Sequence, residues 1–142
     1  MDVLVDSTVW SLALRRRRTA LSEHEARLAR EWDELLTEGR MAIIGMIRQE
    51  VLSGIAIDTE YDRLRRVLRR FDDLPVTSED HERAAAFYNT CRARGIQGSH
   101  TDFLMCAIAE KFDLTIFTTD SDFSRYAAHL PIRLHGVRPE FS

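Results

Sequence analysis

The sequence predicts an α/β fold, a three-layer α/β/α sandwich with a central, mainly parallel sheet. Two observations lead to this prediction. Apolar runs at residues 3–5, 41–44 and 114–119 have the length and composition of buried strands, and the segments between them carry apolar residues at helical spacing. Strands that are joined through helices pair in parallel, because each crossover helix returns the chain to the same end of the sheet.

The length of 142 residues suits one ordinary domain with one core, and we expect a single domain over residues 1–142. No linker, repeat or low-complexity tract divides it. No apolar run approaches the roughly 18 residues needed to cross a bilayer, and the first residues lack the pattern of a secretory signal. We therefore expect a cytoplasmic protein.

The first part of the chain predicts a strand followed by two helices. The opening strand ends at Asp6, after which Ser7 or Thr8 can cap a short helix. Ser22 and Glu25 have the spacing of a capping box, which predicts a longer helix ending shortly before residue 39.

The middle of the chain predicts one strand and three helices. The strand at 41–44 is followed by a helix that carries Glu50 and breaks near Gly54. Another helix begins near residue 58 and is ended by Pro75, and a third runs from about residue 77 to Gly95.

The last part of the chain predicts a helix followed by two strands. Thr101 is the expected N-cap of that helix, which leads to the strand at 114–119. A short final strand is expected near 132–134.

Four acidic residues define the candidate site: Asp6, Glu50, Asp102 and Asp120 each lie where a predicted strand ends or a helix begins. The carboxyl ends of parallel strands share one edge of a sheet, which is where ligands bind in such folds. Clustered carboxylates raise one another's pKa unless a cation neutralises them, so an apposed set predicts a hard divalent metal, Mg²⁺ or Mn²⁺. Because such an ion can orient water for attack on a phosphodiester, metal-dependent phosphodiester hydrolysis follows as a hypothesis.

Arginine dominates the positive charge. The net charge is −3, which argues against an obligatory nucleic-acid coat, and Lys111 is the one lysine among 20 cationic residues. Arg15–Arg18 form a continuous run at the end of the first predicted helix, and a second set occupies a later helix at positions 63, 65, 66, 69 and 70. Both sets are compatible with a solvated helix surface, and the first is also a candidate for binding phosphate or an acidic partner.

Four motifs together resemble the PIN-domain ribonucleases, and most closely the VapC toxins of bacterial toxin–antitoxin pairs. They are Val-Asp-Ser-Thr-Val-Trp at 5–10, Glu-Val-Leu-Ser-Gly at 50–54, Thr-Asp-Phe-Leu-Met-Cys-Ala-Ile-Ala at 101–109 and Phe-Thr-Thr-Asp-Ser-Asp-Phe at 117–123. Their order and spacing match the family's over essentially the whole chain. The resemblance implies a PIN-like fold and an endoribonuclease that needs Mg²⁺ or Mn²⁺.

The resemblance also implies roles for the acids. Asp6, Glu50, Asp102 and Asp120 would be the catalytic set: Asp6 and Asp102 would hold the metal, Glu50 would bind it or polarise the attacking water, and Asp120 would complete the cage. Thr118 and Ser7 would donate hydrogen bonds to these acids without binding the metal themselves, and Asp122 would lie beside them. Asp122 has two interpretations, since it can point at the rim of the site or cap the following turn.

The family resemblance further implies partners. The substrate would be RNA, with tRNA or rRNA as the expected class. A homodimer is expected, held inactive in a hetero-oligomer by a VapB-type antitoxin, with Arg15, Arg16, Arg17 and Arg18 contacting either RNA or the antitoxin.

Two other functions remain open. A phosphate-accepting receiver domain would need a lysine after a late strand, and Lys111 instead lies within a predicted helix. The other is a PIN fold that binds RNA or protein without cutting, which metal-dependent turnover would exclude. Among the remaining candidates, His100 is expected in a solvent-facing loop, and both tryptophans and both cysteines are expected to be packing residues.

Overall fold

A computed structural model describes residues 1–139, and residues 140–142 of the predicted domain lie outside the described residues. The strands are β1 (Val3–Val5), β2 (Met41–Ala42), β3 (Thr115–Phe117) and β4 (Arg133–Leu134). The helices are α1 (Ser7–Leu14), the 3-10 turn η1 (Arg18–Ala20), α2 (Glu23–Thr37), α3 (Gly45–Leu52), α4 (Asp58–Leu68), α5 (Ser78–Arg92), α6 (His100–Lys111) and α7 (Asp122–Ala127).

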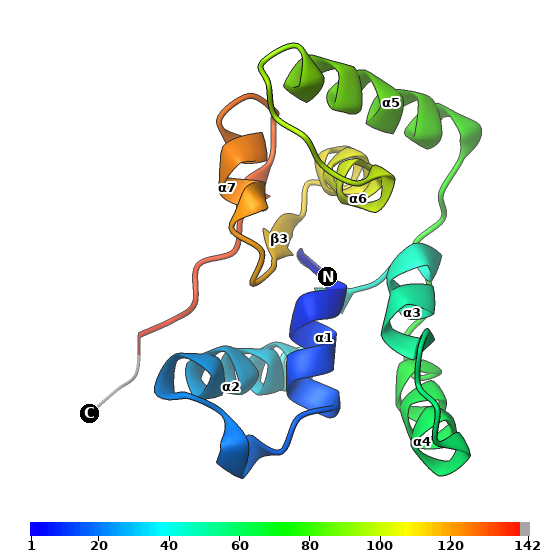
Figure 1. Ribbon diagram of the computed structural model, residues 1–142, viewed down its shortest axis with the longest axis vertical. Coiled ribbons are helices and arrows are strands. Elements are labelled where there is room, and N and C mark those ends of the chain that lie inside the picture. The colour runs from blue at the N-terminus through cyan, green and yellow to red at the C-terminus, as the bar shows by residue number, and fades with distance from the viewer. Residues whose placement is uncertain (140–142) are drawn as a thin grey trace.

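The four strands form one parallel sheet in the order β2-β1-β3-β4. From β1 the chain passes first to one side, to β2, and then crosses to the other side to form β3, so the strand order reverses between β1 and β3. In Figure 1, α5 and α6 lie on one side of β3, whereas α1 and α2 lie on the other. This arrangement confirms the predicted α/β/α layering and places the point of reversal beside Asp6.

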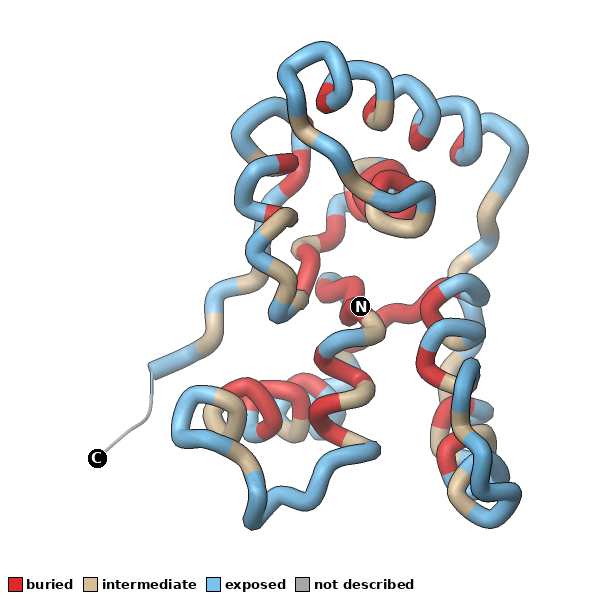
Figure 2. Tube along the Cα trace, viewed as in Figure 1, coloured by how far each residue is buried: buried red, intermediate tan, exposed pale blue. Residues whose placement is uncertain are grey.

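The core lies between these layers, as the buried segments in Figure 2 show. Every residue of β1 is fully buried, and α6 is buried continuously from Phe103 to Ala109. Trp10 and Trp32 are 0% and 4% exposed and pack edge to face with ring centroids 5.6 Å apart, which confirms their packing role. Cys91 and Cys106 are free and buried, as expected.

The predicted capping box of α2 is confirmed, since the Ser22 side chain accepts from Glu25 N–H and the Glu25 side chain accepts from Ser22 N–H. Two other predicted caps are wrong. Asp6 itself, rather than Ser7 or Thr8, caps α1 with its carboxylate. The cap of α6 is the Ser99 hydroxyl, because this helix begins at residue 100, two residues earlier than the sequence indicated.

The strand expected at 41–44 is shorter, because after Ala42 the chain leaves β1 and only Ile43 makes a further bridge, to Asp73. Similarly, the helix expected to continue to Pro75 ends at Leu68. Among residues 1–139 no helix is long and apolar enough to cross a membrane.

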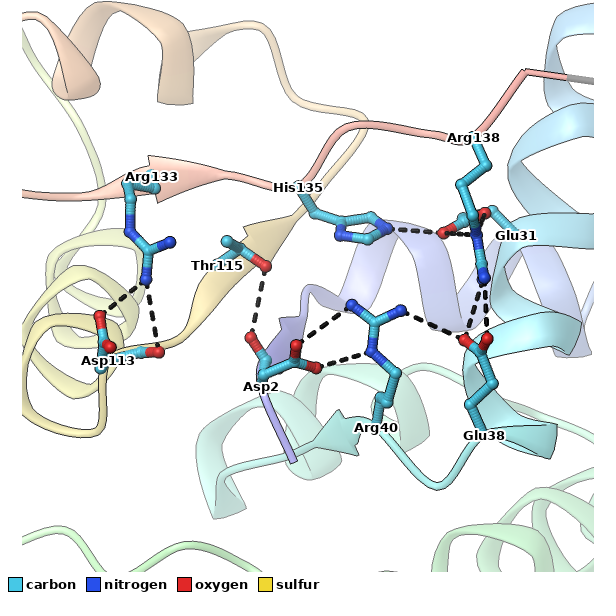
Figure 3. Close-up of polar contacts among 9 residues, drawn as sticks. All are labelled: Asp2, Glu31, Glu38, Arg40, Asp113, Thr115, Arg133, His135 and Arg138. Carbon is cyan, nitrogen blue, oxygen red and sulfur yellow. Dashed lines mark hydrogen bonds and ion pairs between the residues drawn. The ribbon is translucent and has the colours of Figure 1, made fainter.

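A polar network ties the last described segment to α2 (Figure 3). Glu31 is 3% exposed, and its carboxylate contacts His135 Nε2 at 2.7 Å and accepts from Arg138 Nε at 3.0 Å. Burial alone would raise the pKa of Glu31, but the hydrogen bonds from Arg138 and His135 outweigh it, so the pKa lies below its ordinary value. Arg138 also forms a two-pronged pair with Glu38. These contacts attach the segment after β4 to α2 and its C-cap residue.

Candidate metal centre

Asp6 is held firmly at the end of β1. Its backbone N–H donates to the Phe117 carbonyl at 2.9 Å, and its side chain is 6% exposed. The carboxylate accepts from Ser7 N–H at 2.8 Å, from Thr8 Oγ1 at 3.0 Å and from Thr118 Oγ1 at 2.8 Å. These three donors orient both carboxylate oxygens of Asp6. The buried carboxylate is therefore stabilised by hydrogen bonds and not by a cationic side chain.

Thr118 connects the ends of β1 and β3. Its hydroxyl donates to Asp6 Oδ2 and accepts from the Asp120 N–H at 3.0 Å. Asp120 Oδ1 in turn accepts from the Asp122 N–H at 2.9 Å, which shapes the turn into α7. The side chain of Asp122 lies in the first turn of α7 and pairs with Arg125 at 2.5 Å.

Asp102 lies in the first turn of α6, where the helix dipole favours a negative charge. Its backbone N–H donates to the capping Ser99 hydroxyl at 3.1 Å, and its Oδ2 accepts from the phenol of Tyr126 at 2.7 Å. Burial is the main reason that the pKa of Asp102 is raised, and repulsion from Asp6 and Asp120 adds to the rise. The hydrogen bonds from Tyr126 and Ser99 oppose it.

Glu50 completes the set from the exposed side of α3. Desolvation of its carboxylate raises its pKa, and repulsion from Asp6 and Asp102 acts in the same direction, whereas the Ser7 and Thr101 side chains oppose the rise. Each of these repulsions joins acids that are distant in the sequence. The fold therefore brings Asp6, Glu50, Asp102 and Asp120 into one electrostatic neighbourhood, at the point where the strand order reverses.

The side chains present match the ligand preference of Mg²⁺ or Mn²⁺, because they offer carboxylate oxygens whose mutual repulsion a divalent cation would relieve. The arrangement is open: within residues 1–139, no three carboxylate, imidazole or thiol side chains are placed to enclose a metal ion. The oxygen ligands are therefore of the chemical type that a divalent metal prefers. The carboxylates are oriented mainly by hydrogen bonds from the hydroxyl groups of Thr8, Thr118 and Tyr126.

The arginine run lies away from the acids. The helix α1 ends at Leu14 with Arg15 as its C-cap, so only the first arginine of the run belongs to the helix end, and eight helical residues place it about 12 Å along the helix from Asp6. Arg16 pairs with Glu25, and Arg18 pairs with both oxygens of Asp33 at 2.9 Å. These partners on α2 were not foreseen, because they lie 9 and 15 residues away.

A cavity of about 320 Å³ lies between this run and the candidate site. Thr8 and Thr119 line one part of it, and Arg16 and His24 line another. The Thr8 hydroxyl donates to Asp6 and also accepts from the Thr119 N–H at 3.2 Å. The cavity therefore adjoins the side chains that hold Asp6.

Sequence reasoning missed several groups that hold the acids, namely Thr8, Ser99 and above all Tyr126. The sequence does contain a signal for the Ser99 cap, because this serine stands three residues before an acid. His100 is exposed as expected, although it begins α6 rather than lying in a loop, and its ring stacks on Tyr88 at 5.3 Å.

The sequence matches the family model of the PIN domain over residues 3–129. A search of curated protein sequences gives no match. Among solved structures, FitAcB from Neisseria gonorrhoeae is 19% identical with a TM-score of 0.73, covering 94% of this chain and 96% of that one.

Two further solved structures have the same fold. VapBC2 from Rickettsia felis, bound to a DNA fragment from its promoter, is 14% identical with a TM-score of 0.71, covering 95% of this chain and 98% of that one. DNA-bound VapBC from Salmonella typhimurium is 15% identical with a TM-score of 0.65, covering 95% and 97%.

Proposed function

Because this chain belongs to the PIN domain family, we propose that it is a metal-dependent endoribonuclease of the VapC type, a toxin that acts in the cytoplasm and is neutralised by a VapB-like antitoxin. The proposal is supported above all by the mutual repulsion among four acids, Asp6, Glu50, Asp102 and Asp120, near the point where the strand order reverses between β1 and β3. The proposed unit is a single PIN domain of residues 1–142.

In this proposal Asp6, Asp102 and Asp120 hold Mg²⁺ or Mn²⁺. The bound ion would supply a water of lowered pKa and would neutralise charge on the phosphate. Asp6 contributes a carboxylate that Ser7, Thr8 and Thr118 have already oriented. Such prior orientation lowers the cost of assembling the reactive arrangement.

Glu50 is the proposed proton acceptor. Its raised pKa brings it closer to neutral pH, where a carboxylate is a more effective base than at its ordinary pKa. Its position on the exposed face of α3 leaves it accessible to water and to a phosphodiester. Glu50 would therefore take the proton of the attacking water at its carboxylate.

The proposed substrate is structured RNA such as tRNA or rRNA. The cavity that joins Thr8 and Thr119 to Arg16 and His24 supports a path for the RNA backbone beside Asp6. Arg15–Arg18 are the proposed contacts to RNA phosphates or to antitoxin acids. An overall charge of −3 fits a small number of such contacts, with selection by RNA shape.

The proposed partners are a second copy of the chain and a small antitoxin. The similar FitAcB and VapBC structures support the antitoxin, whereas the second copy is implied by the resemblance to the VapC toxins. An antitoxin cation inserted among the acids would compete with the metal. Antitoxin affinity should then weaken with Asp102→Asn, Glu50→Gln or Asp120→Asn, and an affinity that none of the three changes would refute this mode of inhibition.

The proposed activity is tested by incubating EDTA-treated protein with total RNA, with and without Mg²⁺ or Mn²⁺, and mapping new 5′ ends by sequencing. The Asp102→Asn substitution should abolish the new 5′ ends. Asp113→Asn is the matched control, because Asp113 is an exposed acid just before β3 that pairs with Arg133 outside the site.

Discrete ends that need both the metal and Asp102 would support the nuclease and identify its target. If the wild-type chain binds metal but produces no new 5′ ends at protein concentrations well above those of its RNA targets, the non-cleaving binding module becomes the better account.

A further inference from the structure

Tyr126 is a buried aromatic residue with a polar function. It lies in α7, is 0% exposed, and donates its phenol hydrogen to Asp102 Oδ2 at 2.7 Å. The two residues are 24 positions apart in the chain, so this bond fastens α7 to the beginning of α6. A buried hydroxyl that reaches a carboxylate of the candidate site is more than a packing contact.

The ring of Tyr126 is held in place by other aromatic side chains. Phe103 lies 4.9 Å away between ring centroids, and Phe123 lies 5.1 Å away in an edge-to-face arrangement. A tyrosine phenol is protonated at neutral pH, so this hydroxyl acts as a hydrogen-bond donor to the Asp102 carboxylate. The Tyr126 hydroxyl therefore donates its hydrogen bond to Asp102 from a position that the packed ring fixes.

Gly98 provides the space that the hydroxyl needs. A Cβ at this position would lie 2.3 Å from the Tyr126 hydroxyl oxygen, 2.8 Å from its Cζ and 2.9 Å from Phe103 Cε2. Real Cβ atoms do not approach other atoms this closely. Because the clash is with the Tyr126 and Phe103 side chains, glycine is required here for close approach.

We propose that Tyr126 is a positioning residue for Asp102, packed against Gly98 so that its hydroxyl holds Oδ2 in one orientation, in which Oδ1 would be left for the metal. This inference rests on the proposed function, because it assigns Asp102 to the metal. Removing a side chain that hydrogen-bonds to a metal ligand and orients it commonly lowers the metal affinity by 10- to 100-fold. Tyr126 does not itself touch the substrate or the reacting atoms.

The test is Mn²⁺ binding by isothermal titration calorimetry, together with RNA cleavage at saturating Mn²⁺ and thermal unfolding in EDTA. Tyr126→Phe removes only the hydroxyl and keeps the ring packed against Phe103 and Phe123. We expect the Mn²⁺ affinity to fall about tenfold and kcat to fall while KM is unchanged. Thermal unfolding should change little.

Tyr88→Phe is the matched control, because the Tyr88 ring also packs on Phe103, at 5.6 Å, but its hydroxyl lies near Arg92. It should leave the Mn²⁺ affinity unchanged.

The outcomes separate this inference from the proposed function. If wild-type protein binds no Mn²⁺, the proposed function and this inference fall together. If wild type binds Mn²⁺ and Tyr126→Phe binds it equally well, only the positioning role is refuted. A Tyr126→Phe chain that no longer folds would also overturn it, because the hydroxyl would then serve the fold and not the orientation of Asp102.

Discussion

Thr118→Val is the substitution whose effect follows most directly from the structure. The two side chains have nearly the same shape, but valine neither donates to Asp6 Oδ2 nor accepts from the Asp120 N–H. A hydrogen bond to a charged group contributes about 1.5–3 kcal/mol, and a neutral one about 0.5–1.5 kcal/mol.

The net loss should be smaller than the sum of these values, because Thr118 is partly exposed and water can replace some of the missing hydrogen bonding. We expect the free energy of unfolding to fall by about 2 kcal/mol. For a chain of this length that corresponds to a Tm about 6–8 °C lower.

The measurement is urea unfolding followed by circular dichroism at pH 7 in EDTA. Thr115→Val is the matched control, since Thr115 lies at the opposite end of β3 from Thr118 and its hydroxyl makes only a 3.3 Å bond to the Asp2 carbonyl. It should cost less than about 0.5 kcal/mol. Equal losses for the two variants, or no loss for Thr118→Val, would refute the view that this hydroxyl joins β1 to β3.

Four other results are expected. Glu31→Gln should cost about 1.5–3 kcal/mol at pH 7, and because the folded pKa of Glu31 is lowered, the gap to wild type in urea titrations should close as the pH falls below about 4.5. Gly98→Ala should lose about 1–3 kcal/mol in the same assay, and adding Tyr126→Phe should restore part of it by removing the 2.3 Å approach to the hydroxyl. Asp102→Asn should raise the Tm in EDTA, because burial and repulsion raise the pKa of this carboxyl, while it abolishes any shift on adding Mn²⁺. Alanine at Arg15–Arg18 should reduce the salt dependence of RNA cleavage by about one unit of log–log slope for each phosphate that the run neutralises, and an unchanged slope would make the run ordinary surface.

The sequence predicted the parts of the site that local patterns encode. An acid directly after a buried strand is a local pattern, and Asp6 and Asp120 were found in this way. The capping box of Ser22 and Glu25 is equally local, because all of its bonds lie within four residues. Parallel pairing of the strands then implies that Asp6 and Asp120 share one edge of the sheet, because the carboxyl ends of parallel strands lie together.

The groups that hold the acids were much harder to predict, since their contacts cross the fold. Thr118 reaches Asp6 over 112 positions and Tyr126 reaches Asp102 over 24. Tyr126 lies on α7, a helix of six residues that was not predicted from the sequence. The ion pairs of Arg16 and Arg18 were missed for the same reason, because they depend on how the chain turns after α1.

The acids of the candidate site work against the stability of the fold that presents them. Desolvation and mutual repulsion raise the pKa values of Glu50 and Asp102, so at neutral pH their ionised forms cost folding free energy. The Tyr126 hydroxyl offsets part of this cost at Asp102, and the Thr8 and Thr118 hydroxyls stabilise the buried Asp6 in the same way, with hydrogen bonds that leave the negative charge in place. Cationic side chains would stabilise the acids more strongly, but they would also take the place of the metal. A shell of neutral donors is therefore the arrangement expected where carboxylates must stay ionised, oriented and available to a cation.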